Sequence, residues 1–242
     1  PLLKSVPNLL SMKQTTSFIA LFGVLVLLGA GCTATPEVPP AEDPVEPVVV
    51  EAPEPEPEPI MEEPTQEDGR VRLADFTEPP TSLPGILAEE ELLNREVLLN
   101  TSKGAIRLSL RGDIAPQTVS NFLILAHTGF YDGLTFHRFE PGFVIQGGDP
   151  DGTGRGGPGY TVPAEINEEL PHDPYVLAIA RHGDPVNPLR ASSGSQFYIT
   201  LADASFLNGM YTTFGTVVEG TAFVDALRAD DTITSIEILP TK

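Results

Sequence analysis

The feature that most constrains this 242-residue chain is an acidic, proline-rich tract at residues 33–68. It holds 10 of the 25 prolines and 12 acidic side chains, and it has no Lys or Arg. Proline offers no backbone N–H, and neighbouring carboxylates repel one another, most clearly where Glu and Pro alternate over 54–59. Such a tract cannot bury enough apolar surface to fold, so we expect a disordered, extended tether. At ~3.1 Å per residue it could span on the order of 100 Å. Docking of the tract by a partner is the alternative to a plain spacer.

The tether also accounts for most of the formal net charge of −20, because residues 95–242 carry only −7. A chain without clustered Lys and Arg is a poor candidate for nucleic-acid binding, since phosphate recognition needs such clusters. The single cysteine, Cys32, excludes an intrachain disulfide framework and a Cys-based structural zinc site.

Residues 1–31 have the composition of an export signal. Met12-Lys13 supplies a short positive start, and an apolar run follows over 18–28. A run of 11 residues is too short to cross a bilayer, which needs roughly 20, but it suits a cleaved signal peptide. We therefore expect a signal peptide at 1–31 whose true start is Met12.

The end of this signal, Leu28-Gly29-Ala30-Gly31-Cys32, resembles that of a bacterial lipoprotein, in which the cysteine becomes the lipidated N-terminus. One departure is Gly29, which stands where an apolar residue is usual, with Leu28 one place earlier. The resemblance implies a lipidated Cys32 at the start of the tether (32–68) and an exported protein anchored to a bacterial membrane. The alternative is an ordinary signal in which Cys32 is incidental.

Residues 69–94 form a transition segment between the tether and the last part of the chain. The acidic and apolar stretch 89–93 is compatible with a short helix, whereas Pro79, Pro80 and Pro84 interrupt regular structure before it. The sequence assigns this segment no function.

The last segment, 95–242, has the patterning of a folded domain. Apolar residues alternate over 106–110, as in a half-buried strand. Pro116 suits a first helical turn, and apolar residues then recur at helical spacing to Ala126, with Gly129 as a stop signal. A second helix is predicted at 222–228. Short strands are expected at 142–145, 176–180, 196–201, 213–218 and 236–238. Many short strands with two helices indicate an all-β sandwich or barrel.

Three motifs that would suggest other chemistry fail on their context. Residues 152–157 match G-x-G-x-x-G, but a dinucleotide site needs that loop to open a helix, and Pro158-Gly159 follows instead. Ser192–Ser195 is not G-x-S-x-G. The histidines lack metal-ligand spacing such as H-x-x-x-H; they are His127, His137, His172 and His182. We therefore expect no covalent or metal-based hydrolase, and predict no metal and no cofactor.

The densest pattern lies at 136–149, which reads FHRFEPGFVIQGGD. Arg138, Val144 and Gln146 share parity along an extended chain and would point to one face. A cation and an amide beside an apolar surface make a poor core but a suitable floor for a bound peptide. A rim Arg138 without a role is the alternative on this pattern alone.

This stretch resembles the signature F-H-R-x-x-P-G-F-x-x-Q-G-G-D of the cyclophilin-type peptidyl-prolyl isomerases. Residues 115–122, 129–133, 195–199 and 214–217 resemble further segments of the same family, in order. The resemblance covers roughly 95–240 and does not extend to 1–94. It implies that 95–242 is an isomerase domain with a closed, eight-stranded antiparallel β-barrel capped by two helices.

The resemblance also implies a set of site residues. Arg138 would be the hydrogen-bond donor that assists rotation of an Xaa-Pro bond, with Phe143 and Gln146 beside it. Val144, Tyr198 and Leu207 would complete the proline pocket, with Phe206 and Tyr211 at its edge. The main chain at Ala180 and Arg181 would pair with the peptide as a short strand. For each apolar residue, barrel core is the alternative role.

Four of these positions depart from the best-known eukaryotic pattern. Val144 stands where Met is usual, Tyr198 where Phe is, Phe206 where Trp is, and Tyr211 where His is. Each keeps an apolar or aromatic surface, so we expect the activity to survive, although Tyr198 should make the pocket floor more polar.

The sequence thus predicts a monomeric isomerase whose partners are proline-containing polypeptides folding outside the cytoplasm. The alternative, from a different class, is a proline-binding or chaperone module with the same fold and little catalysis. Retention of Arg138, Phe143 and Gln146 favours the enzyme.

Overall fold

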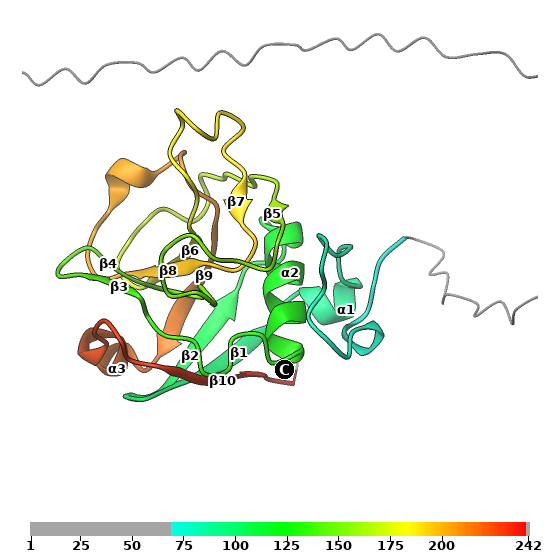
Figure 1. Ribbon diagram of the computed structural model, residues 1–242, viewed down its shortest axis with the longest axis horizontal. Coiled ribbons are helices and arrows are strands. Elements are labelled where there is room, and N and C mark those ends of the chain that lie inside the picture. The colour runs from blue at the N-terminus through cyan, green and yellow to red at the C-terminus, as the bar shows by residue number, and fades with distance from the viewer. Residues whose placement is uncertain (1–68, 241–242) are drawn as a thin grey trace, which may run out of the picture. The chain divides into compact units, whose positions relative to one another are not determined.

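The computed structural model describes residues 69–240, which form an eight-stranded antiparallel sheet that curls into a half-barrel (Figure 1). The strand order is β10-β1-β2-β9-β6-β8-β4-β3, and a separate two-stranded ladder joins β5 and β7. The strands are β1 (Glu96–Thr101), β2 (Gly104–Leu110), β3 (Arg138–Glu140), β4 (Val144–Gly147), β5 (Thr161–Val162), β6 (Val176–Ile179), β7 (Ser192–Ser193), β8 (Phe197–Thr200), β9 (Thr213–Glu219) and β10 (Ile233–Ile238).

The expected closed barrel is wrong in one respect, because the sheet does not close. Its edge strands, β3 and β10, are not paired with each other, and an isolated bridge between Thr135 and Thr232 joins the segments that precede them. Around that bridge, the N–H of Phe136 donates to the carbonyl of Asp231 at 2.8 Å. The physical reason is where the backbone pairs: residues 133–136, before β3, make the hydrogen bonds to 230–233, whereas β3 pairs with β4. The all-β architecture itself is confirmed.

The helical elements are few and short. They are α1 (Glu89–Leu92), α2 (Pro116–His127) and α3 (Thr221–Ala226), with 3-10 turns η1 (Leu73–Asp75) and η2 (Ser205–Leu207). Both helices predicted for the last segment form, and so does the short helix within 89–93. None of the helices within residues 69–240 has the length and apolar character needed to cross a membrane.

Helix α2 follows the sequence pattern closely. Pro116 occupies its first turn, where a missing N–H leaves no intrahelical bond unmade. The face that repeats at helical spacing is buried, with Val119 and Phe122 fully inaccessible. The helix ends before Gly129, whose φ of +72° is a backbone conformation that side-chain-bearing residues seldom adopt.

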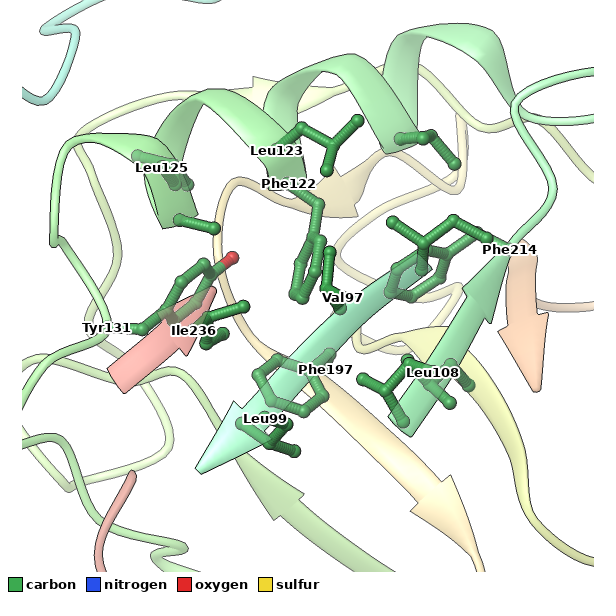
Figure 2. Packing of buried hydrophobic residues seen from close by; sticks show 14 of the residues in the cluster. Val97, Leu99, Leu108, Phe122, Leu123, Leu125, Tyr131, Phe197, Phe214 and Ile236 are labelled. Atoms are coloured by element: carbon green, nitrogen blue, oxygen red, sulfur yellow. The ribbon is translucent and has the colours of Figure 1, made fainter. Parts of the chain in front are cut away.

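Aromatic rings from α2 and the sheet form the centre of the core (Figure 2). The ring of Phe122 lies 5.7 Å from that of Phe197 on β8 and 5.3 Å from that of Phe214 on β9, measured between centroids. Tyr131 contacts both Phe122 and Phe197. Tilted and edge-on arrangements of this kind stabilise a core beyond the area that they bury. The core therefore fixes β8 and β9 relative to α2.

Residues 69–94, to which the sequence assigned no function, pack onto α2 (Figure 1). Val71 and Leu87 form a parallel bridge, and the side chain of Leu87 is fully buried. The N–H of Leu87 donates to the hydroxyl of Ser120 at 2.9 Å, and the amide of Gln117 donates to the carbonyl of Pro84. The segment is therefore an integral part of the folded unit.

Replacement of Leu87 by Ala tests this packing. We expect the free energy of unfolding to fall by about 2–4 kcal/mol, because a fully buried leucine leaves a cavity. Urea denaturation measures the change, and Leu189→Ala is the matched control because that leucine is 86% exposed. Equal, small effects of the two substitutions would show that the segment is not part of the cooperative unit.

One histidine, His172, is buried in this fold, and a second, His137, is partly buried with both ring nitrogens shielded from solvent. His172 is 1% exposed, and neither ring nitrogen of His137 has a hydrogen-bond partner within residues 69–240. Burial lowers the pKa of both side chains, because it disfavours the charged imidazolium. Below the ordinary histidine pKa of about 6.5, the unfolded chain therefore binds protons that the folded chain does not.

This burial predicts that stability declines as the pH falls below about 6.5. We expect urea denaturation at about pH 5.5 to give a lower free energy of unfolding than at about pH 7.5. Replacing His137 and His172 together with Gln should flatten the decline, whereas replacing the exposed His127 and His182 should not. An unchanged decline in the first double variant would rule out this cause.

Candidate active site

A cavity of about 260 Å³ opens beside strands β3, β4, β6 and β8. It brings together nine of the ten substrate-contacting residues predicted from the sequence. They are Arg138, Phe143, Val144, Gln146, Ala180, Arg181, Tyr198, Leu207 and Tyr211.

Strand register places the floor of this cavity. Arg138 on β3 pairs with Gln146 on β4, Gln146 pairs with Tyr198 on β8, and Tyr198 pairs with Ala178 on β6. Directly paired residues of antiparallel strands project to the same face of a sheet. A single row across four strands therefore carries the cation, the amide and the aromatic ring.

Arg138, Val144 and Gln146 share one face, as parity along an extended chain predicts, but residues 138–146 are not one extended stretch. The chain reverses through a turn in which the N–H of Phe143 donates to the carbonyl of Glu140. Arg138 and Gln146 share a face because they are partners across a hairpin. Gly148, with φ +81°, ends β4, and a Cβ there would collide with the carbonyl of Ser195.

Arg138 lies at the mouth of the cavity, and its side chain is 42% exposed. Its guanidinium is 5.8 Å from the centroid of the Phe143 ring and 3.7 Å from the carboxylate of Glu140. A guanidinium keeps its charge at all ordinary pH values and presents several N–H donors in a plane. Arg138 can therefore donate hydrogen bonds to a ligand that rests on Phe143.

Gln146 is held by a second glutamine that the sequence argument did not single out. The amide N–H of Gln146 donates to Oε1 of Gln196 at 2.9 Å, and the amide of Gln196 donates to the carbonyl of Gly156 at 2.8 Å. Gln196 is 5% exposed. The sequence signal that could have identified Gln196 is its position inside 195–199, one of the segments that resemble the family. The relay leaves Oε1 of Gln146 to accept from a ligand.

The apolar part of the cavity is a small cluster separate from the main core. Val144, Ala178 and Tyr198 are buried in it, with Phe143 and Leu207 packed alongside. Burial raises the pKa of the Tyr198 phenol, so this ring stays uncharged. The cluster forms a pocket for a compact apolar group.

Phe206 is the one predicted contact residue that does not line the cavity. Its side chain is 68% exposed, and its ring stacks on Phe143 with centroids 5.5 Å apart. It therefore supports Phe143 from the rim.

Arg181 closes one end of the cavity with a nearly inaccessible side chain, 2% exposed. Its guanidinium lies 4.6 Å from the Tyr211 ring centroid and 2.6 Å from the Asp184 carboxylate, and Nε donates to the carbonyl of Met210. This arrangement attaches the loop after β6 to the loop after η2.

Backbone hydrogen bonding differs between Arg181 and the residue before it, Ala180. The N–H of Ala180 donates to the carbonyl of Gln196, and its carbonyl accepts from the N–H of Ser193. In the part of the chain that the structure describes, no hydrogen bond involves the backbone N–H or carbonyl of Arg181. Of the two predicted residues, Arg181 is thus the one that offers both groups to an extended peptide.

A second, larger cavity of about 640 Å³ adjoins the first and shares Gln146, Ala180 and Arg181 with it. The glycine-rich loop over 152–157 contributes to its wall. The element that follows this loop is β5 and not a helix, so the loop lacks the helix N-terminus to which a dinucleotide's pyrophosphate binds. Within residues 69–240 there is also no group of three or more His, Cys, Asp or Glu side chains that could hold a metal ion.

Known proteins share both the sequence and the fold. The family described as cyclophilin type peptidyl-prolyl cis-trans isomerase/CLD matches residues 96–240. A peptidyl-prolyl cis-trans isomerase of Synechococcus elongatus is 47% identical over 146 residues, which cover 60% of this chain and 96% of that protein. Peptidyl-prolyl cis-trans isomerase B of Bacillus subtilis is 44% identical over 134 residues, covering 55% of this chain and 90% of that protein.

Among solved structures, a cyclophilin type isomerase of Cryptosporidium parvum superposes with a TM-score of 0.55 at 32% identity, covering 60% of this chain and 97% of that one. The matched region contains the row from Arg138 to Tyr198 and the cavity beside it. The chain therefore belongs to the cyclophilin-type peptidyl-prolyl cis-trans isomerase family.

Proposed function

We propose that this chain accelerates the rotation of Xaa-Pro bonds in extended segments of proteins that fold outside the cytoplasm, with Arg138 as the principal donor. The observation that carries the proposal is the cavity itself. It joins an exposed guanidinium and a fixed amide to an apolar pocket along one strand row.

The reaction needs a particular kind of assistance. Rotation about a peptide bond must break amide resonance, which gives a barrier of ~20 kcal/mol and leaves the spontaneous event at about 10–100 s for proline. In the twisted state the nitrogen regains its lone pair. A donor that binds this nitrogen better in the twisted state than in the planar state therefore lowers the barrier.

The residues of the cavity can divide these tasks. The pocket of Phe143, Leu207 and Tyr198 would hold the proline ring while the other side of the bond turns. Arg138 would donate to the carbonyl before the proline and to the proline nitrogen as resonance is lost. Gln146 would accept from the substrate backbone, and the N–H and carbonyl of Arg181 would pair with it as a short strand.

Replacement of Arg138 by Ala tests the central role. We expect the rate of cis/trans exchange of an Xaa-Pro peptide, measured by exchange NMR, to fall about 100-fold, as when one donor to a transition-state charge is removed. Arg72→Ala is the matched control, because its side chain is 45% exposed, pairs with Glu90 and lies outside the cavity.

Three results would separate the alternatives. An unimpaired Arg138→Ala variant would contradict the donor role. A wild-type chain that binds the peptide in a titration but leaves its exchange at the spontaneous rate would be a proline-binding module. A wild-type chain that does neither would contradict the use of this cavity altogether.

Our proposal also includes an exported, membrane-anchored protein, which rests on the sequence of the first 32 residues. Met12-Lys13, the apolar run at 18–28 and the small residues before Cys32 support it. All of these lie outside the described residues. A lipid-anchored isomerase would act on proline-containing chains near a membrane surface, where its reaction needs no ATP.

Mass spectrometry of the mature protein, expressed in a bacterium from Met12, tests the anchor. We expect an N-terminal Cys32 that carries a diacylglyceryl group, and a membrane-associated protein. Cys32→Ser should abolish both the added mass and the membrane association. A mature chain with an unmodified Cys32, or one that lacks it, would contradict the lipid anchor while leaving the isomerase activity untouched.

A further inference from the structure

The cavity floor contains a phenol whose hydroxyl needs a partner. Tyr198 lines the pocket, is 5% exposed, and lies among apolar side chains. A buried hydroxyl without a hydrogen bond is strongly unfavourable. The Tyr198 hydroxyl meets Nε2 of His172 at 3.0 Å, and the His172 side chain lines neither cavity.

The second hydrogen bond of this histidine fixes which nitrogen carries the proton. Oδ1 of Asn208 lies 2.8 Å from the backbone N of His172 and 2.9 Å from Nδ1 of its ring. The backbone N–H can only donate, so the Asn208 atom in this position is the accepting oxygen. Nδ1 must then carry the ring proton. Since His172 is neutral when buried, Nε2 is an acceptor and the Tyr198 hydroxyl donates to it.

His172 also joins two parts of the pocket that come from distant segments. Asn208 directly follows η2, which supplies Leu207, and the N–H of Ala204 donates to the carbonyl of His172 at 2.9 Å. The imidazole is stacked with Tyr198 and edge-on to the ring of Tyr211. One side chain therefore connects the floor on β8 to the wall formed by 205–211.

We propose that His172 is a positioning residue of the proline pocket. By accepting a hydrogen bond from the Tyr198 hydroxyl it keeps that donor from the ligand and from water, and through Asn208 it holds the 205–211 wall against the floor. The proposal rests on the proposed function, since it takes the proline ring as the occupant. Without His172 as its acceptor, the Tyr198 hydroxyl would bind water or a substrate carbonyl. The proline ring of the substrate would then enter a more hydrated and less well-formed pocket.

The direct test is the tautomer in the wild-type protein. The ¹⁵N chemical shifts of the His172 ring at about pH 7.5, above the ordinary histidine pKa, should show a protonated Nδ1 and an unprotonated Nε2. A protonated Nε2 would overturn the proposal. This measurement depends on neither activity nor the folding of any variant, so it also separates failure here from failure of the isomerase assignment.

Substitutions test the consequence for binding. In titrations with an Xaa-Pro peptide, His172→Leu should weaken binding roughly tenfold, as expected for a buried donor left without its acceptor. The exchange rate of the saturated complex should change much less. His172→Gln should recover most of the affinity, because its amide oxygen can take the place of Nε2.

The same pair of substitutions in a Tyr198→Phe background is the specificity control. There the hydroxyl is gone, so His172→Leu and His172→Gln should bind the peptide equally. Cooperative thermal unfolding verifies that each variant is folded. The proposal is overturned if folded His172→Gln binds no better than His172→Leu, or if their difference persists in the Tyr198→Phe background.

Discussion

The register of four antiparallel strands is the constraint on which the site depends. Arg138, Gln146 and Tyr198 occupy one paired row across β3, β4 and β8. Because side chains alternate along a strand, the residues on either side of Tyr198, Phe197 and Ile199, enter the main core instead. A slip by one residue would exchange the two faces, so core packing against α2 and site geometry are specified together.

Local periodicity predicted the elements whose pattern depends on near neighbours in the chain. The alternation at 106–110 and the helical repeat after Pro116 each depend on near neighbours, and both elements form where expected. The family resemblance supplied the identities of the cavity residues, and the cavity gathers all of them except Phe206. Patterning alone gave the face of Arg138 but not the hairpin that places it there.

The features that the sequence did not predict all rest on long-range contacts. The open edge of the sheet depends on which backbone groups pair across it, since 133–136 and not β3 contact 230–233, and alternation of apolar residues does not encode that choice. Residues 69–94 have no apolar repeat of their own, and their packing becomes clear only once Leu87 is seen bonded to Ser120 on α2. Likewise, Gln196 supports Gln146 across 50 positions of sequence. Such partners are chosen by the fold, not by their neighbours in the chain.

Tyr198 shows how a single substitution has to be judged with its partners. From the sequence, a phenol in place of a phenyl ring should make the pocket floor more polar. In the structure the added hydroxyl is bonded to His172, which in turn is bonded to Asn208. Each hydrogen bond satisfies a group that would otherwise be buried without a partner, so the polar atoms form a connected chain beneath an apolar surface. A tyrosine in this apolar pocket is therefore compatible with proline binding, because His172 accepts the hydrogen bond of its hydroxyl and Asn208 accepts that of the histidine ring.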